Sequence, residues 1–265
     1  MADRYTHAKQ VVPHYYLSVE LNMEKLVQMR SDLGGEVSVL NLIMKGAASN
    51  AVESDIESIR SRMLLMGGTA VEMIKCSLDG LLKGSDESLQ KTFELEEKVN
   101  DAEVEVDALC NKFIVLRAPA AYDLRFVLCT LRMIRDIERI GDEAEKMARI
   151  AKFFHDDVHT ITPKPNLSLM VNDVVQMLEK VLNAYARDDD SELRKVINFD
   201  QVVDEKFRQT LNDLMSFIIN KKESVGCCID LIFFAKALER IGDHAKNMSE
   251  SVIFMIKGKD LRHVG

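Results

Sequence analysis

A helical pattern of apolar residues that occurs twice constrains the fold of this 265-residue chain more than any other feature. The first copy surrounds Ile137-Glu-Arg-Ile-Gly-Asp-Glu-Ala144, and Leu238-Glu-Arg-Ile-Gly-Asp-His-Ala245 follows 101 residues later. On both sides of each copy, apolar residues recur at steps of three and four, as in an amphipathic helix with one buried face. The chain is therefore expected to contain two copies of one helical unit.

Each copy carries two carboxylates beside its apolar stripe, Glu138 with Asp142 and Glu239 with Asp243. Residues four apart lie about one helical turn apart, so both carboxylates of a pair project from the same face. Like charges at this spacing repel, and the repulsion grows where water is scarce. A basic side chain of a partner helix or a bound cation would relieve it; the alternative is two solvated faces with ordinary acids.

Gly141 and Gly242 occupy the same place in the two copies. A glycine inside a helix costs roughly 1 kcal/mol relative to alanine. Its repetition indicates that another backbone or side chain comes close at this point of each helix.

The composition fits long helices and argues against several functional classes. Proline is 4 and glycine 12, and the net charge of −8 disfavours nonspecific nucleic-acid binding. No apolar run of roughly 18 residues predicts a membrane span, and the N-terminus lacks a signal-peptide core. Five cysteines without a Cys-x-x-Cys motif fit a cytoplasmic protein better than a disulfide framework or a zinc site.

The periodicity predicts an all-α protein of two tandem three-helix bundles. The first helix is expected from Val52 to about Gly84, the second after Ser85, and the third from Pro119 to about Phe154.

A linker over residues 155–165 then separates three further long helices, with a turn at 188–191 and a last helix from Ser224. Short connections imply antiparallel neighbours in each bundle. The predicted domains are residues 1–50, 51–157 and 163–260.

Residues 1–50 do not share this pattern and form a short α/β-like fragment. Val11–Leu21 is predicted as a strand, and Asn22–Asp32 and Val37–Ala48 as short helices. The stretches Ala8–Met23 and Val39–Ala48 resemble the start of the catalytic domain of dihydrolipoamide acyltransferases. The His-x-x-x-Asp-Gly motif of that family has no match here, so the fragment is expected to lack acyltransferase activity.

The second helix of each half adds further oxygen donors, Glu96 with Asn100 and Asp200 with Asp204. In an antiparallel bundle these pairs can meet the acids of the third helix, and four converging oxygen donors would suit a hard cation. No Glu-x-x-His motif supports a ferritin-type di-iron site. The alternative is acids that face solvent and never converge.

The paired Glu-Arg-Ile-Gly-Asp motifs, Pro119-Ala-Ala-Tyr-Asp-Leu-Arg125 and the tail Lys257-Gly-Lys-Asp-Leu-Arg-His-Val-Gly265 resemble the PhoU family of phosphate-uptake regulators, over roughly residues 51–265. This resemblance implies a cytoplasmic, often dimeric protein that reaches the membrane only through its partners. It also implies repression of phosphate-starvation signalling, by linking the ATPase subunit of a phosphate ABC transporter to a sensor histidine kinase.

Members of that family bind iron, manganese or magnesium through Glu/Asp-x-x-x-Asp motifs, and Asn100 departs from this pattern. The matching positions, which are the candidate metal ligands, are Glu96, Asn100, Glu138, Asp142, Asp200, Asp204, Glu239 and Asp243.

The leading hypothesis is therefore a regulatory adaptor rather than an enzyme, because no catalytic triad, P-loop or dinucleotide fingerprint is present in the sequence. The alternative is a carboxylate-rich helical-bundle metalloprotein with redox or hydrolytic activity. That class needs a histidine ligand, for which His244 is the motif-adjacent candidate.

Overall fold

The computed structural model describes residues 39–156 and 165–258. The chain divides into two compact units, residues 1–56 and residues 57–265, and the described part of the first unit is helical. The long helices of the described ranges are α3 (Val39–Lys83), α4 (Asp86–Arg117), α5 (Ala121–Asp156), α6 (Leu167–Arg187), α7 (Leu193–Asn220) and α8 (Val225–Lys257), with a 3-10 turn, η1 (Lys222–Ser224), before α8. No strand occurs within these ranges. The all-α prediction is confirmed.

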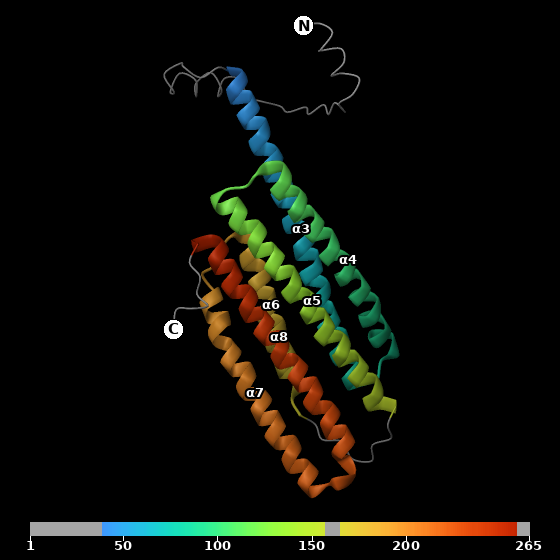
Figure 1. The fold of residues 1–265 in the computed structure, drawn as a ribbon. Coiled ribbons are helices and arrows are strands. Elements are labelled where there is room, and N and C mark those ends of the chain that lie inside the picture. The colour runs from blue at the N-terminus through green and yellow to red at the C-terminus, as the bar shows by residue number, and fades with distance from the viewer. Residues whose placement is uncertain (1–38, 157–164, 259–265) are drawn as a thin grey trace. The chain divides into compact units, whose positions relative to one another are not determined.

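In the second unit, α5 and α8 pack against each other along their length (Figure 1). Helix α4 packs on α5, whereas α6 and α7 pack on α8. The Ser77 hydroxyl of α3 donates to the carbonyl of Ala144 on α5 at 2.8 Å. The two copies of the sequence motif therefore lie on the two central helices, with α4 packed beside α5 and α6 and α7 packed on α8.

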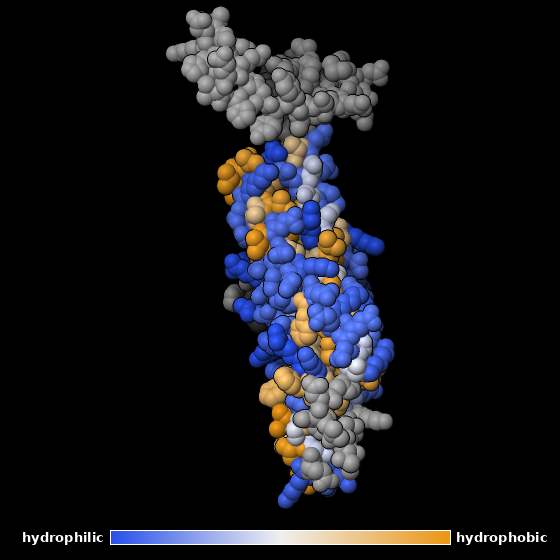
Figure 2. All heavy atoms as spheres, turned by 90° about the vertical axis from the view of Figure 1, so that its right-hand side faces the viewer, coloured by the Kyte–Doolittle hydropathy of each residue, from blue (hydrophilic) through white to orange (hydrophobic). Residues whose placement is uncertain are grey.

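The apolar stripes of the two motifs form the centre of this core. Ile137, Ile140, Leu238 and Ile241 have no measurable exposure. The opposite sides of the helices are polar, so the face shown in Figure 2 is mostly hydrophilic, with apolar atoms in separate groups. No helix within the described ranges is long and apolar enough to cross a membrane.

A nearly buried arginine joins the two repeats. Arg60 on α3 is 8% exposed, and its Nη2 atom donates to Asp188 Oδ2 at 3.1 Å. The guanidinium also lies 5.1 Å from the ring centre of Phe126 on α5 and 5.3 Å from that of Tyr185 on α6. These contacts tie α3 and α5 of the first repeat to the end of α6 in the second.

Local signals explain the start of α4. Ser85 caps the helix by accepting from the backbone N–H of Ser88 at 3.2 Å, and two acids, Asp86 and Glu87, occupy its first turn. Gly84 precedes the cap with φ of 63°, a left-handed conformation that glycine adopts without strain. The predicted restart of the chain at Ser85 is confirmed.

Two predicted helix starts are wrong. The first long helix begins at Val39, not Val52, and it absorbs the short helix predicted over Val37–Ala48. Residues 46–50 contain one glycine, two alanines and no proline, so nothing in them stops a helix. Pro119 lies in the connection between helices, and α5 starts at Ala121. The strand and helix predicted within residues 11–32 lie outside the described residues.

Candidate functional site

The first set of predicted ligands lies on α4 and α5. Asn100 Nδ2 donates to Glu96 Oε1 at 2.5 Å on α4. On α5, Arg139 pairs with both acids of the motif, at 3.4 Å to Glu138 Oε2 and 3.5 Å to Asp142 Oδ2. The pKa of Glu138 is raised, first by burial and then by the charge of Asp142, with smaller contributions from the α4 acids including Glu96. The acids of the two helices therefore share one electrostatic neighbourhood.

The second set lies on α7 and α8 and is more deeply embedded. Asp200 is 2% exposed, and Lys246 Nζ lies 2.8 Å from its Oδ2 atom. The other oxygen, Oδ1, is buried and has no hydrogen-bond partner. An unsatisfied buried carboxylate oxygen costs free energy, so it marks a place where a donor or cation would be favourable.

The acids of the second set influence one another electrostatically. The pKa of Asp243 is raised by burial first, then by the charges of Glu239, Asp200 and Asp204, and Lys246 opposes this shift. Glu239 Oε2 accepts from Lys236 at 2.5 Å, and Asp204 lies 3.9 Å from Arg208. Each acid close to Asp200 thus has a basic side chain nearby.

These neighbouring acids do not form a coordination shell as they stand. Within residues 39–156 and 165–258, no group of three or more His, Cys, Asp or Glu side chains is arranged to hold a metal ion. Lysine, arginine and asparagine partners hold the candidate oxygen donors instead. The donor type and the free Asp200 oxygen suit a hard cation, whereas its ligation requires some of these side chains to change partners.

Close approach explains both motif glycines. A Cβ atom at position 141 would lie 3.3 Å from Val99 Cγ1 of α4. A Cβ atom at position 242 would lie 3.4 Å from Val203 Cγ1 and 3.5 Å from Asp200 Oδ1 of α7. The prediction that another side chain comes close at each glycine is confirmed, and in the second repeat one of those atoms is the unpartnered oxygen.

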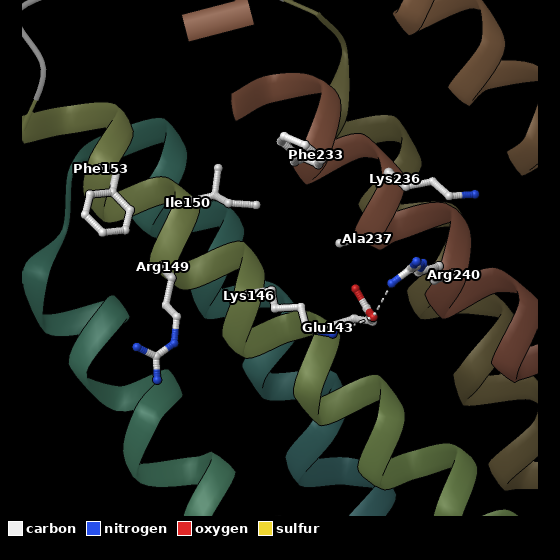
Figure 3. A pocket seen from close by; sticks show the side chains of 9 residues that line it. All are labelled: Glu143, Lys146, Arg149, Ile150, Phe153, Phe233, Lys236, Ala237 and Arg240. Atoms are coloured by element: carbon white, nitrogen blue, oxygen red, sulfur yellow. Dashed lines mark hydrogen bonds and ion pairs between the residues drawn. The ribbon is translucent and has the colours of Figure 1, made fainter. Parts of the chain in front are cut away.

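Sequence reasoning missed a groove between α5 and α8 (Figure 3). Its apolar part has a volume of about 410 Å³, and its polar part, of about 480 Å³, shares Glu143, Lys146 and Arg240 with it. Glu143 is buried and accepts from Lys146 at 2.9 Å and from Arg240 at 3.1 Å. We call this pair of cavities the α5–α8 groove; its further lining residues are Arg149, Ile150, Phe153, Phe233, Lys236 and Ala237 in the apolar part and Arg139, Asp243, His244, Lys246 and Asn247 in the polar part.

One sequence signal points to half of this groove. Lys146, Arg149 and Lys152 recur at three-residue spacing and form a basic face near the end of α5. The other half comes from α8, and the basic face is not repeated there, because Asn247 and Glu250 occupy the positions of Lys146 and Arg149. The repeated motif therefore contains Arg139 and Arg240 of the lining, whereas the basic face near the end of α5 has no counterpart on α8.

Comparison with known proteins supports the division of the chain into two helical repeats. A sequence profile of the PhoU domain matches the chain twice, over residues 63–151 and 167–252. The chain belongs to the PhoU family. Each match covers most of one three-helix repeat, so the expected family resemblance and the internal duplication are both confirmed.

Individual PhoU proteins extend the match over most of the chain. The phosphate-specific transport system accessory protein PhoU of Serratia marcescens is 32% identical over 227 residues, which is 85% of this chain and 92% of that protein. The PhoU homolog of Pseudomonas aeruginosa is 30% identical over 82% of this chain and 90% of its own length. A crystal structure of PhoU from Pseudomonas aeruginosa superposes with a TM-score of 0.74 at 29% identity, covering 78% of this chain and 99% of that one.

Proposed function

We propose that this protein is a non-catalytic accessory component of a phosphate-specific transport system. The observation that carries this proposal is the double PhoU match across both repeats, together with relatives at 30% and 32% identity that are named as accessory proteins of such a system. In this role the protein represses phosphate-starvation signalling from the cytoplasmic side. It does so by linking the ATPase subunit of a phosphate ABC transporter to a sensor histidine kinase.

Deletion and complementation test this function. In a strain that lacks the gene, a phosphate-starvation promoter fused to a reporter should be active even when phosphate is abundant. The full chain supplied from a plasmid should restore repression. Purified transporter ATPase and the soluble part of the kinase should each bind the immobilised protein. Normal repression in the deletion strain would contradict the proposal.

We further propose that the acid pairs bind divalent or trivalent metal ions, with magnesium, manganese and iron as candidates. The candidate ligands are Glu96, Asn100, Glu138 and Asp142 in the first repeat and Asp200, Asp204, Glu239 and Asp243 in the second. The unpartnered Asp200 Oδ1 atom and the mutual repulsion around Asp243 support the second site. A bound cation would supply charge neutralisation there, in place of the ammonium group of Lys246.

Homodimer formation belongs to the same proposal. Sedimentation of the purified full chain over a range of concentrations tests it, with and without a chelator. A monomer under all conditions would contradict the dimer without affecting the accessory role.

A further inference from the structure

The apolar part of the α5–α8 groove exposes two aromatic rings. Phe153 on α5 is 65% exposed and Phe233 on α8 is 60% exposed, on opposite sides of the floor formed by Ile150 and Ala237 (Figure 3). Neither ring contributes to the buried core, and exposed aromatic surface beside a groove is typical of a protein interaction site.

Basic residues predominate in the lining of the groove, although the chain carries a net charge of −8. Six lysines and arginines line its two parts, against the acids Glu143 and Asp243. On the outer sides, Arg149 rests 5.4 Å from the ring centre of Phe93 on α4, and Lys236 rests 5.3 Å from that of Phe207 on α7. Acids outside the lining pair with most of these cations, so what the groove offers an anionic occupant is the exposed surface of Arg149 and Lys236.

The rim cations are accessible to a second carboxylate. Arg149 pairs with Glu145 at 2.6 Å, but its side chain is 61% exposed, and Lys236, paired with Glu239, is 40% exposed. Their partners Glu145 and Glu239 are mostly buried, at 23% and 15% exposure, so a carboxylate from another molecule would pair with the exposed side of each cation while the present partner stays in place.

We propose that the α5–α8 groove is a docking site for an acidic amphipathic segment of a partner protein. A large apolar side chain of that segment inserts between Phe153 and Phe233, and flanking carboxylates pair with Arg149 and Lys236 on the two rims. An open groove between two long helices, α5 and α8, suits a helical segment that presents one apolar face. A small anion would use the charges and leave both rings exposed. This inference depends on neither the phosphate role nor the metal sites.

Three synthetic helical peptides with the same phenylalanine-centred apolar face test the proposal. Their polar faces carry glutamate, glutamine or lysine, and fluorescence anisotropy with the full chain in chelator measures binding. The glutamate peptide should bind about tenfold more tightly than the glutamine peptide, and the lysine peptide more weakly still. Phe153→Ser and Phe233→Ser should each weaken binding about tenfold, because anchor residues carry most of the affinity of such interfaces.

Matched variants outside the groove serve as controls. Leu65 on α3 is as exposed as Phe153, at 65%, so Leu65→Ser should leave binding unchanged. Arg149→Gln should weaken binding of the glutamate peptide, whereas Arg62→Gln, at an exposed ion pair on α3, should not. All five substituted positions are exposed, so melting temperatures should stay close to wild type.

Several outcomes would overturn the proposal. No binding of the glutamate peptide, equal binding of all three peptides, or equal effects of the groove and control variants would exclude a docking site for an acidic segment. Displacement by inorganic phosphate at constant ionic strength would assign the groove to a small anion. If Phe233→Ser weakens binding to phosphatidylglycerol vesicles but not to the glutamate peptide, the groove binds a lipid surface. If Phe233→Ser weakens self-association but not peptide binding, the groove binds a second copy of this chain.

Discussion

At the scale of single residues, the two acid sets differ in their counter-charge. Lys246 neutralises the buried Asp200 in the second repeat, and Glu145 occupies the equivalent position in the first. A buried carboxylate needs a paired cation, because desolvation otherwise outweighs its other interactions. The same motif therefore carries its own cation in one repeat and an additional acid in the other.

Replacing Lys246 tests this difference. Lys246→Met should lower the free energy of unfolding in chelator by roughly 1–3 kcal/mol, less than for a fully buried pair because the lysine is partly exposed. Manganese or magnesium should restore more stability to this variant than to wild type, because the cation replaces the lost ammonium. Urea unfolding with and without metal measures both effects. Lys195→Met, at an exposed ion pair with Glu192, is the control and should show neither.

The Lys246–Asp200 ion pair makes the free energy of unfolding depend on pH. The hydrogen bond and charge of Asp200 raise the pKa of Lys246 above 10.5 in the folded protein. Its contribution to stability is therefore complete below pH 10.5 and is lost as the pH rises through the folded-state pKa. Lys246→Met should flatten the alkaline limb of the stability curve, and an unchanged limb would show that another group produces it.

The two acids with raised pKa values lower the stability of the folded protein, whereas the Lys246–Asp200 pair raises it. Glu138 and Asp243 bind a proton more tightly in the folded state, so they destabilise the metal-free protein at neutral pH and do so less as the pH falls toward their usual range. Glu138→Gln and Glu239→Gln/Asp243→Asn should each stabilise the chelated protein by about 0.2–0.5 kcal/mol per relieved like-charge pair. Melting curves should show that gain together with loss of any stabilisation by manganese. An equal metal response in wild type and variants would exclude these ligands.

At the scale of helices, the sequence predicts what depends on local spacing. Steps of three and four residues identify α4 to α8, and spacing of four places Glu239 and Asp243 on one face of α8. The pairing of Lys246 with Asp200 depends on how α7 and α8 are set against each other, which no spacing within one helix specifies. The groove is harder still, since its cations come from two different helices, and Lys146 and Arg149 have no basic counterpart on α8.

The apolar stripe beside the repeated motif predicts that a charged side chain placed on it destabilises the protein. Ile241 has no measurable exposure on α8, so Ile241→Asp should cost several kcal/mol and abolish cooperative unfolding of the protein. Ile219→Asp on α7 is the matched control, because Ile219 is 75% exposed, and its effect should stay within about 0.5 kcal/mol. Far-UV circular dichroism during thermal unfolding distinguishes the two. A wild-type melting point for Ile241→Asp would show that the stripe does not face a core.

At the scale of the whole molecule, the repeats are joined through their central helices. The Arg240–Glu143 pair connects α8 to α5, and Arg60 connects α3 to Asp188 at the end of α6. Periodicity predicted two tandem bundles, and the PhoU match confirms the duplication. The joining contacts were not predictable, because they depend on which helices of the two repeats pack together, and no spacing within one helix specifies that.

The compact second unit predicts that residues 1–50 are dispensable for stability, whereas residues 51–60 are not. Residues 57–265 form a compact unit of their own, so removal of residues 1–50 should change the free energy of unfolding by less than about 1 kcal/mol. Removal of residues 1–60 also deletes Ile59, which is 1% exposed, and Arg60, and should cost several kcal/mol. Arg60→Met in the shorter deletion separates the two residues, because it leaves Ile59 in place. Urea unfolding of the three variants measures these differences, and a large loss of cooperativity on removal of residues 1–50 alone would show that the fragment completes the core.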